Sequence, residues 1–132
     1  MTNSTINNNT INTDTRFSTE GAGMLVSSGS ATLTNNTITA NSGWRTGGLY
    51  LSGASTNLYL ANTIIAGNSG GSSAYNNFYK ASGNLYNNGY NIIGKSTSFT
   101  TTTGDWYDSA GTGVYTLSGS ATTGTINLDK QN

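Results

Sequence analysis

The chain has 132 residues, of which 77 are Asn, Thr, Ser or Gly, whereas charged residues make up only 8% and the formal net charge is zero. This length is typical of one domain. Lys and Arg are not clustered, which argues against nucleic acid or an anionic membrane as a partner. There is no Cys or His, so thiolate and imidazole metal ligands and Ser-His or Cys-His nucleophile pairs are excluded. No apolar run is long enough to insert into a membrane.

Apolar residues recur along the chain at a spacing of 27 residues. The apolar columns are Ile11/Ile38/Ile65/Ile92, Met24/Leu51/Phe78, Ser4/Ala31/Leu58/Leu85 and Ile6/Leu33/Leu60/Asn87. Polar columns with the same spacing are Asn8/Asn35/Asn62, Asp14/Asn41/Asn68 and Ser28/Ser55/Ser82. A fixed period of this length is typical of a solenoid, in which each repeat buries its apolar face against its neighbours.

Each repeat is expected to hold three short strands. In one repeat, alternating apolar and polar residues predict strands over residues 48–51, 57–62 and 64–66, with turns at 52–55 and 67–73. No segment has a convincing helical period, so we predict almost no helix. Three strands and three turns in one repeat form one coil of a parallel β-helix, with equivalent residues about 4.8 Å apart in successive coils.

The period ends near residue 96. Beyond it, residues 113–117 and 125–128 are predicted strands, and 118–124 is a predicted turn. We therefore divide this single all-β domain into about four repeats over residues 1–95 and an irregular part over 96–132. That part is expected to be an irregular final coil or a strand pair over the open end, because an uncovered strand edge promotes aggregation.

The polar columns are expected to form ladders, one of them inside the coils. Asn8, Asn35 and Asn62 share the inward phase at a strand end, where stacked amides can bond to one another and to the turn backbone. A structural role is therefore favoured over a ligand role for these residues.

Three segments resemble right-handed parallel β-helix surface proteins. Residues 35–41, 47–51 and 62–68 are similar to their Gly-Gly-hydrophobic and hydrophobic-x-x-Asn signatures, which also occur in the chlamydial polymorphic outer-membrane proteins. A closer resemblance is to the bacterial choice-of-anchor Q proteins, through Asn-Thr-Ile-Ile-Ala-Gly-Asn at 62–68, Gly-Tyr-Asn-Ile-Ile-Gly at 89–94, and the Phe-Thr and Gly-Asp pairs within 99–105. The resemblance covers about residues 1–105, and residues 106–132 lack the Pro- and Gly-rich continuation of that group. The resemblance implies a right-handed β-helix and an extracellular or cell-surface location, mostly without known activity.

The charged residues do not predict catalysis. Glycoside hydrolysis normally needs two carboxylates beside the scissile bond, but no column holds two acids. The acids are Asp14, Glu20, Asp105, Asp108 and Asp129. The basic residues Arg16, Arg45, Lys80 and Lys95 fall in different coils with no acid clustered beside them. Asp105 and Asp108 share a loop that could bind a cation, although solvated side chains are the simpler interpretation. We predict no enzyme activity, no catalytic or metal site and no cofactor.

Aromatic residues are the candidate contacts for a glycan or another partner. Thr5, Thr32, Tyr59 and Tyr86 form one outward column, with Tyr50, Trp44 and Tyr75 in neighbouring strands or turns. Exposed rings can stack on sugars, although cross-strand Tyr pairs also stabilise a sheet without any ligand. Ice binding is disfavoured because the Thr-x-Thr pairs at 32–34 and 37–39 are replaced by Ala61 and Ala66 in the next repeat.

These features predict a non-catalytic extracellular β-helix with a structural, adhesive or self-assembling role at the cell surface. The alternative is a carbohydrate-binding or polysaccharide-degrading β-helix. The repeat begins almost at residue 1 and no signal peptide or anchor is evident, so we expect the chain to be a segment of a longer protein. We also expect self-association end to end, as filaments or dimers, because net charge is zero and strand edges seek partners.

Overall fold

The computed structural model describes residues 1–11, 20–71, 75–108, 114–119 and 123–125. The regular secondary structure of this part of the chain is β-strand, without any α-helix, as predicted, and no helix in it could cross a membrane. The strands are β1 (Thr5–Asn7), β2 (Met24–Val26), β3 (Ser30–Thr34), β4 (Thr37–Thr39), β5 (Leu49–Leu51), β6 (Asn57–Ala61), β7 (Ile64–Ile65), β8 (Phe78–Lys80), β9 (Asn84–Asn87), β10 (Ile92–Ile93), β11 (Trp106–Tyr107), β12 (Val114–Leu117) and β13 (Thr123–Thr125).

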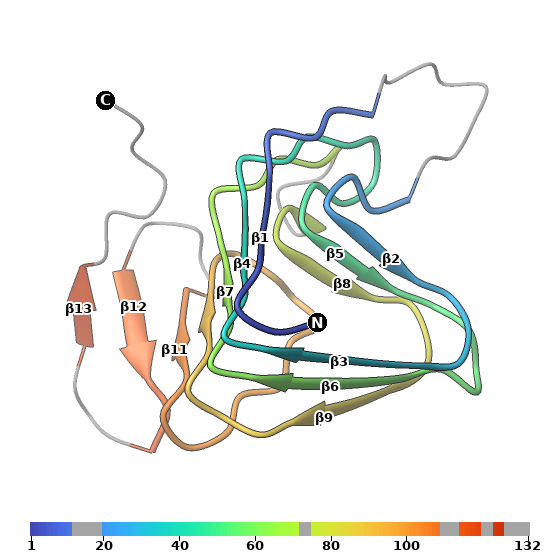
Figure 1. Ribbon diagram of the computed structural model, residues 1–132. Helices are drawn as coiled ribbons and strands as arrows, with labels where there is room; N and C mark the ends of the chain where they lie inside the picture. Colours follow the sequence, from blue (N-terminus) through green and yellow to red (C-terminus); the bar gives the residue numbers. More distant parts are fainter. Residues whose placement is uncertain (12–19, 72–74, 109–113, 120–122, 126–132) are drawn as a thin grey trace.

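The strands form three sheets that the chain visits in turn. Two sheets are parallel and three-stranded, with the orders β2-β5-β8 and β3-β6-β9. The third has the order β1-β4-β7-β10-β11-β12-β13 and is parallel as far as β11. Figure 1 shows the sheets as three sides of a triangle around a common interior. The prediction of an all-β fold with parallel sheets is confirmed for the described residues.

The observed register corrects several predicted columns. Ala31/Leu58/Leu85 and Leu33/Leu60/Asn87 are confirmed as partners. The isoleucine column, however, is Ile6/Ile38/Ile65/Ile93, so Ile11 and Ile92 do not belong to it, and neither Ser4 nor Ile6 pairs with β3. Another column is Met24/Leu49/Phe78, with Leu51 opposite Val26 and Lys80.

Unequal turn lengths explain these errors. Equivalent corner residues are 32 residues apart in the first step, 27 in the second and 28 in the third. Strands keep their alignment when a turn gains residues, because the gain is absorbed in the loop. A constant spacing therefore finds the repeat but misplaces residues wherever a turn is longer.

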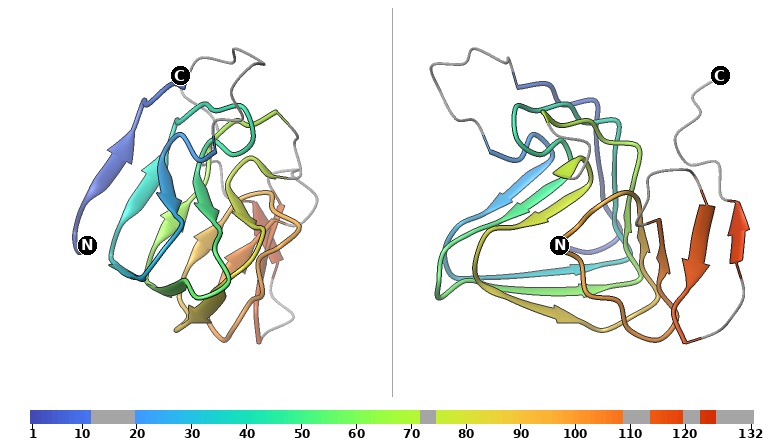
Figure 2. Two further views of the ribbon diagram at one scale, coloured as in Figure 1. Left: turned by 90° about the vertical axis from the view of Figure 1, so that its right-hand side faces the viewer. Right: turned by 180° about the vertical axis from the view of Figure 1, so that it is seen from behind.

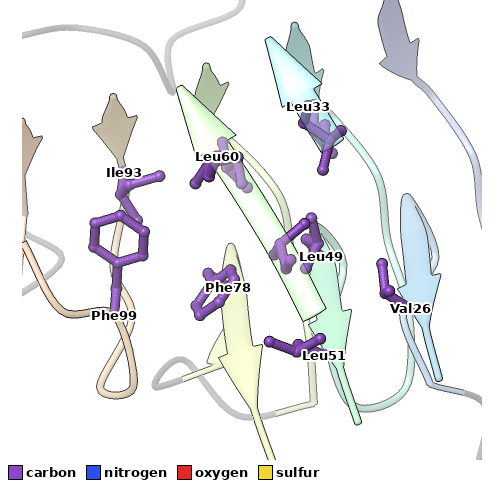
Figure 3. Close-up of a cluster of buried hydrophobic side chains, with 11 residues drawn as sticks. Val26, Leu33, Leu49, Leu51, Leu60, Phe78, Ile93 and Phe99 are labelled. Carbon is purple, nitrogen blue, oxygen red and sulfur yellow. The ribbon is translucent and has the colours of Figure 1, made fainter. Parts of the chain in front are cut away.

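The interior holds a continuous cluster of buried apolar side chains. Figure 3 shows it from Val26 at one end to Ile93 and Phe99 at the other, with Leu49 and Leu60 between them. The members are Val26, Leu33, Ile38, Leu49, Leu51, Leu58, Leu60, Ile65, Phe78, Ile93 and Phe99. Alternate residues of a strand point to opposite faces, so β6 buries Leu58 and Leu60 and exposes Tyr59 between them.

The corners are formed by residues with positive φ. Asn3, Asn35 and Asn62 have φ of 51°, 56° and 49°, and Asn8 has 55° in a second corner with Ala40 and Gly67. Asn tolerates this left-handed conformation better than most residues. Asn8, Asn35 and Asn62 are exposed, so the prediction that they point inward is wrong. After Asn35 and Asn62, the next residues, Asn36 and Thr63, are buried instead.

Residues that follow the corners form two hydrogen-bonded ladders, which are exposed or half-buried at their first member and buried from the second member on. In the first, the backbone N–H of Ser4 donates to Asn36 Oδ1 at 3.1 Å. In the same way the N–H of Asn36 donates to Thr63, that of Thr63 to Asn91, and that of Asn91 to Asp105, each time to a side-chain oxygen. In the second, the N–H groups of Asn9, Asn41 and Asn68 donate to the next side-chain oxygen, each at 3.0 Å, as far as Asn77. Asp14, predicted for the second ladder, lies outside the described residues, and Asn9 holds the position aligned with Asn41.

The segment after β10 continues the stack beyond residue 95. Phe99 packs edge-on against Phe78 with ring centroids 5.4 Å apart, and β11 is still parallel to β10. β12 lies within the predicted strand 113–117, whereas β13 begins within the predicted turn 118–124. Residues 126–128 of the last predicted strand lie outside the described residues. Strands β12 and β13 extend the third sheet as antiparallel partners.

Candidate functional site

Two exposed tyrosines form a stacked pair on the outer side of the β3-β6-β9 sheet. Tyr59 and Tyr86 are register partners with ring centroids 4.6 Å apart and ring planes 11° from parallel. They are 36% and 44% exposed. Thr32 is the next residue of the column on β3, as predicted, but Thr5 pairs with Thr37 in another sheet and is not part of it.

An exposed amide ladder runs beside this pair. Asn84 Nδ2 donates to Asn57 Oδ1 at 3.0 Å, and Asn57 Nδ2 donates to Ser30 Oγ at 3.4 Å. Asn57 and Asn84 precede the tyrosines by two residues and therefore project from the same side of the sheet. Tyr59, Tyr86, Asn57 and Asn84 are called the tyrosine strip below. It offers ring surfaces and hydrogen-bonding amides side by side.

A second aromatic group surrounds an open pocket of about 190 Å³, lined by Trp44, Arg45, Gly71 and Tyr75. Trp44 is 38% exposed. The ring centroids of Tyr75 and Tyr79 are 4.1 Å apart. The ring of Tyr79 in turn lies 5.3 Å from that of Tyr50.

Tyr50 does not offer a contact surface. It is only 2% exposed, so the expectation of an exposed Tyr50 face is wrong. The reason is that its outward side is covered by neighbouring groups: the Tyr79 ring packs against it and Arg45 lies 5.8 Å from its ring centre. Tyr50 therefore packs against Tyr79 and bonds to Arg45 rather than facing solvent.

The position of Arg45 is set by two partners. Its Nη1 donates to the Tyr50 hydroxyl at 3.0 Å and to Glu20 Oε1 at 3.3 Å. The hydrogen bond to Tyr50 contributes most to raising the pKa of Arg45, so the guanidinium is charged at any ordinary pH. The sequence-based expectation that Arg45 has no acid beside it is therefore wrong. Glu20 and Arg45 are 25 residues apart in the sequence. Because this separation differs from the repeat spacing, the spacing does not predict that the two residues meet.

The two aromatic groups do not form one site. Tyr59 and Tyr86 lie on β6 and β9, along one side of the triangle, whereas the turn from β4 to β5 that carries Trp44 lies at the opposite corner (Figure 1). The predicted contact residues therefore define two separate surfaces.

The acids of the final loop are buried. Asp105 is fully buried, and its oxygens accept bonds from the Asn91 and Thr102 N–H groups and from Asn87 Nδ2. Asp108 is 2% exposed, so the expectation of solvated side chains is wrong for both. Asp105 closes the first ladder because a carboxylate accepts hydrogen bonds without needing to donate one. No group of three or more acids suited to a metal occurs in the described ranges, which omit Asp14 and Asp129.

Comparison with known proteins identifies no relative. No protein-family model, curated protein or solved structure matches the chain. Its function therefore has to be inferred from the geometry of the fold and of the two aromatic surfaces.

Proposed function

We propose that the chain is a right-handed parallel β-helix that serves as a non-catalytic structural, adhesive or self-assembling module outside the cell or at its surface. The observation that carries this proposal is the stack itself, in which three sheets share one apolar interior and two buried polar ladders. Such a stack presents long, regular outer faces, and proteins of this type commonly act through those faces.

The two ends of the stack differ, and this difference supports one mode of self-association. At one end, Phe99 packs on Phe78, Ser98 Oγ accepts the Lys80 N–H, and the Thr100 carbonyl accepts a bond from Asn87. At the end formed by β1, β2 and β3, here called the first-strand end, the inward residues Ile6, Met24 and Ala31 are only partly buried. Figure 2 shows these ends on opposite sides of the stack. Contact between two first-strand ends is therefore favoured over filaments.

Substitution of Leu25 by Lys is expected to abolish this association. Leu25 lies on β2 and is 45% exposed, so Lys is accommodated in the monomer, whereas two such charges repel when first-strand ends meet. Light scattering as a function of concentration should detect dimers of the parent and monomers of Leu25→Lys.

Val114→Lys is the matched control, since Val114 is 47% exposed on β12, away from the first-strand end. It should associate like the parent. A parent that stays monomeric at millimolar concentration, or equal loss of dimers in both variants, would refute association through this end.

A second candidate function is carbohydrate binding, and the tyrosine strip favours it. Tyr59 and Tyr86 are 36% and 44% exposed, so the stacked pair presents aromatic surface to the apolar side of a sugar ring, and the neighbouring amides can bond to hydroxyl groups. The β-helix would then act as an adhesive surface for an extended glycan.

The double substitution Tyr59→Ala/Tyr86→Ala is expected to remove glycan binding by this strip, because it deletes both stacking surfaces. Binding to a panel of polysaccharides should fall by about 5-fold or more, since two ring contacts of about 0.5–1.5 kcal/mol each, the value for an aromatic pair, are lost. The control Tyr59→Phe/Tyr86→Phe retains the rings and should retain most binding. Equal binding by parent and Ala variant would refute the carbohydrate role of the strip.

A further inference from the structure

The pocket beside Trp44 has the size of a single six-membered ring. Its volume is about 190 Å³, slightly more than the roughly 150 Å³ of an engineered protein cavity that binds benzene. Among the described residues that line it, Trp44 and Tyr75 are aromatic. A ring-shaped ligand can therefore enter and contact aromatic side chains, whereas a much larger molecule would project into solvent.

The pocket is held open by the backbone as well as by side chains. The N–H of Gly71 donates to the carbonyl of Trp44 at 2.7 Å, which joins the turns that form its walls. A Cβ on Gly71 would lie 2.1 Å from the Trp44 carbonyl oxygen, so this close approach requires glycine. Arg45 is fixed by Tyr50 and Glu20, as described above. These described walls are therefore in place before any ligand arrives, which reduces the entropic cost of binding.

Arg45, which lines the pocket, and Glu20, which is bonded to Arg45, together suit a ligand with hydroxyl groups. A guanidinium has five N–H donors, and the two described side-chain bonds of Arg45 both use Nη1. The Glu20 carboxylate beside it accepts hydrogen bonds. A hydroxyl group both donates and accepts, so it can satisfy an adjacent Arg–Glu pair. Because the two charges cancel locally, the pair gives an anionic ligand little advantage over a neutral one.

We propose that the pocket lined by Trp44, Arg45, Gly71 and Tyr75 binds one neutral pyranose ring, either a free sugar or one unit of a glycan. The aromatic residues contact the apolar face of the ring, and Arg45, held in place by Glu20, bonds to its hydroxyl groups. This site goes beyond the structural role proposed above. It is also separate from the tyrosine strip, so either can fail without the other.

The tryptophan content allows a direct test. The chain has two tryptophans, Trp44 and Trp106, so Trp106→Phe leaves Trp44 as the reporter at the pocket. Its fluorescence should change saturably on titration with glucose, galactose or N-acetylglucosamine, with a dissociation constant of about 1 mM for a ligand of this size. Saturation-transfer NMR of the same sugars with the parent protein provides a second measurement if Trp106→Phe fails to fold.

Three controls define the outcome. Arg45→Gln in the Trp106→Phe background should weaken binding about 10-fold by removing a charge-assisted hydrogen bond, while Tyr59→Ala/Tyr86→Ala should leave it unchanged. No response in either measurement up to about 100 mM sugar would overturn the proposal. A response to glucuronate or phenol at least as strong as that to the neutral sugars would overturn the assigned ligand class, and loss of binding in the Tyr59→Ala/Tyr86→Ala variant would overturn the location.

Discussion

Substitution of Asn68 by Ala is expected to lower the free energy of unfolding by about 3–5 kcal/mol, because several buried polar groups lose their partner at once. Asn68 Oδ1 accepts bonds from the backbone N–H and the Nδ2 of Asn41, each at 3.0 Å. Its Nδ2 donates to the carbonyls of Ile38 and Ala66 and to Asn77 Oδ1. Each orphaned buried group costs about 1–3 kcal/mol. Urea denaturation followed by circular dichroism measures the effect.

Asn84→Ala is the matched control for this prediction. Asn84 also belongs to an amide ladder, since its Nδ2 donates to Asn57 Oδ1 at 3.0 Å, but this bond is exposed. Water replaces a lost partner there, so the expected cost is about 1 kcal/mol or less. Equal destabilisation by the two variants would contradict the view that burial makes the inner ladder essential.

The general arrangement of the fold could be predicted because it follows from local patterns. Alternation around Leu58 and Leu60 identifies a strand with one buried face, and the repeat spacing identifies its partners on β3 and β9. Positions beyond a longer turn could not be predicted, since spacing records chain length rather than spatial alignment. Ile92 illustrates this point: one extra residue moves it out of the column and puts Ile93 opposite Ile65.

The orientation of the corner residues was predicted wrongly for a different reason. Asn35 and Asn36 are identical residues next to each other, and composition does not reveal which one takes the left-handed conformation. In the structure Asn35 has φ of 56° and is exposed, while Asn36 is buried. The pair Asn35-Asn36 at a strand end thus marks a corner and a ladder position. The in–out alternation of the preceding strand, however, stops at the corner and does not predict which of the two residues is buried.

The candidate sites were predictable only where they follow a strand. Tyr59 and Tyr86 are outward by alternation and sit in the regular part of the repeat. The Arg45–Glu20 pair and the pocket beside Trp44 depend on how turns of different rounds fold against one another. Turn conformation is not periodic, so spacing cannot identify residues that meet in this way.

Substitution of Ile65 by Ala is expected to lower the free energy of unfolding by about 2–5 kcal/mol, the range for truncating a buried aliphatic side chain. Ile65 is fully buried on β7, between its register partners Ile38 and Ile93. Both neighbours are fixed by their own strands, so they cannot move far to fill the cavity left by the lost carbon atoms. Tyr59→Ala, on the outer face, should cost about 1 kcal/mol or less. Similar urea midpoints for the two variants would mean that the interior is not the main source of stability.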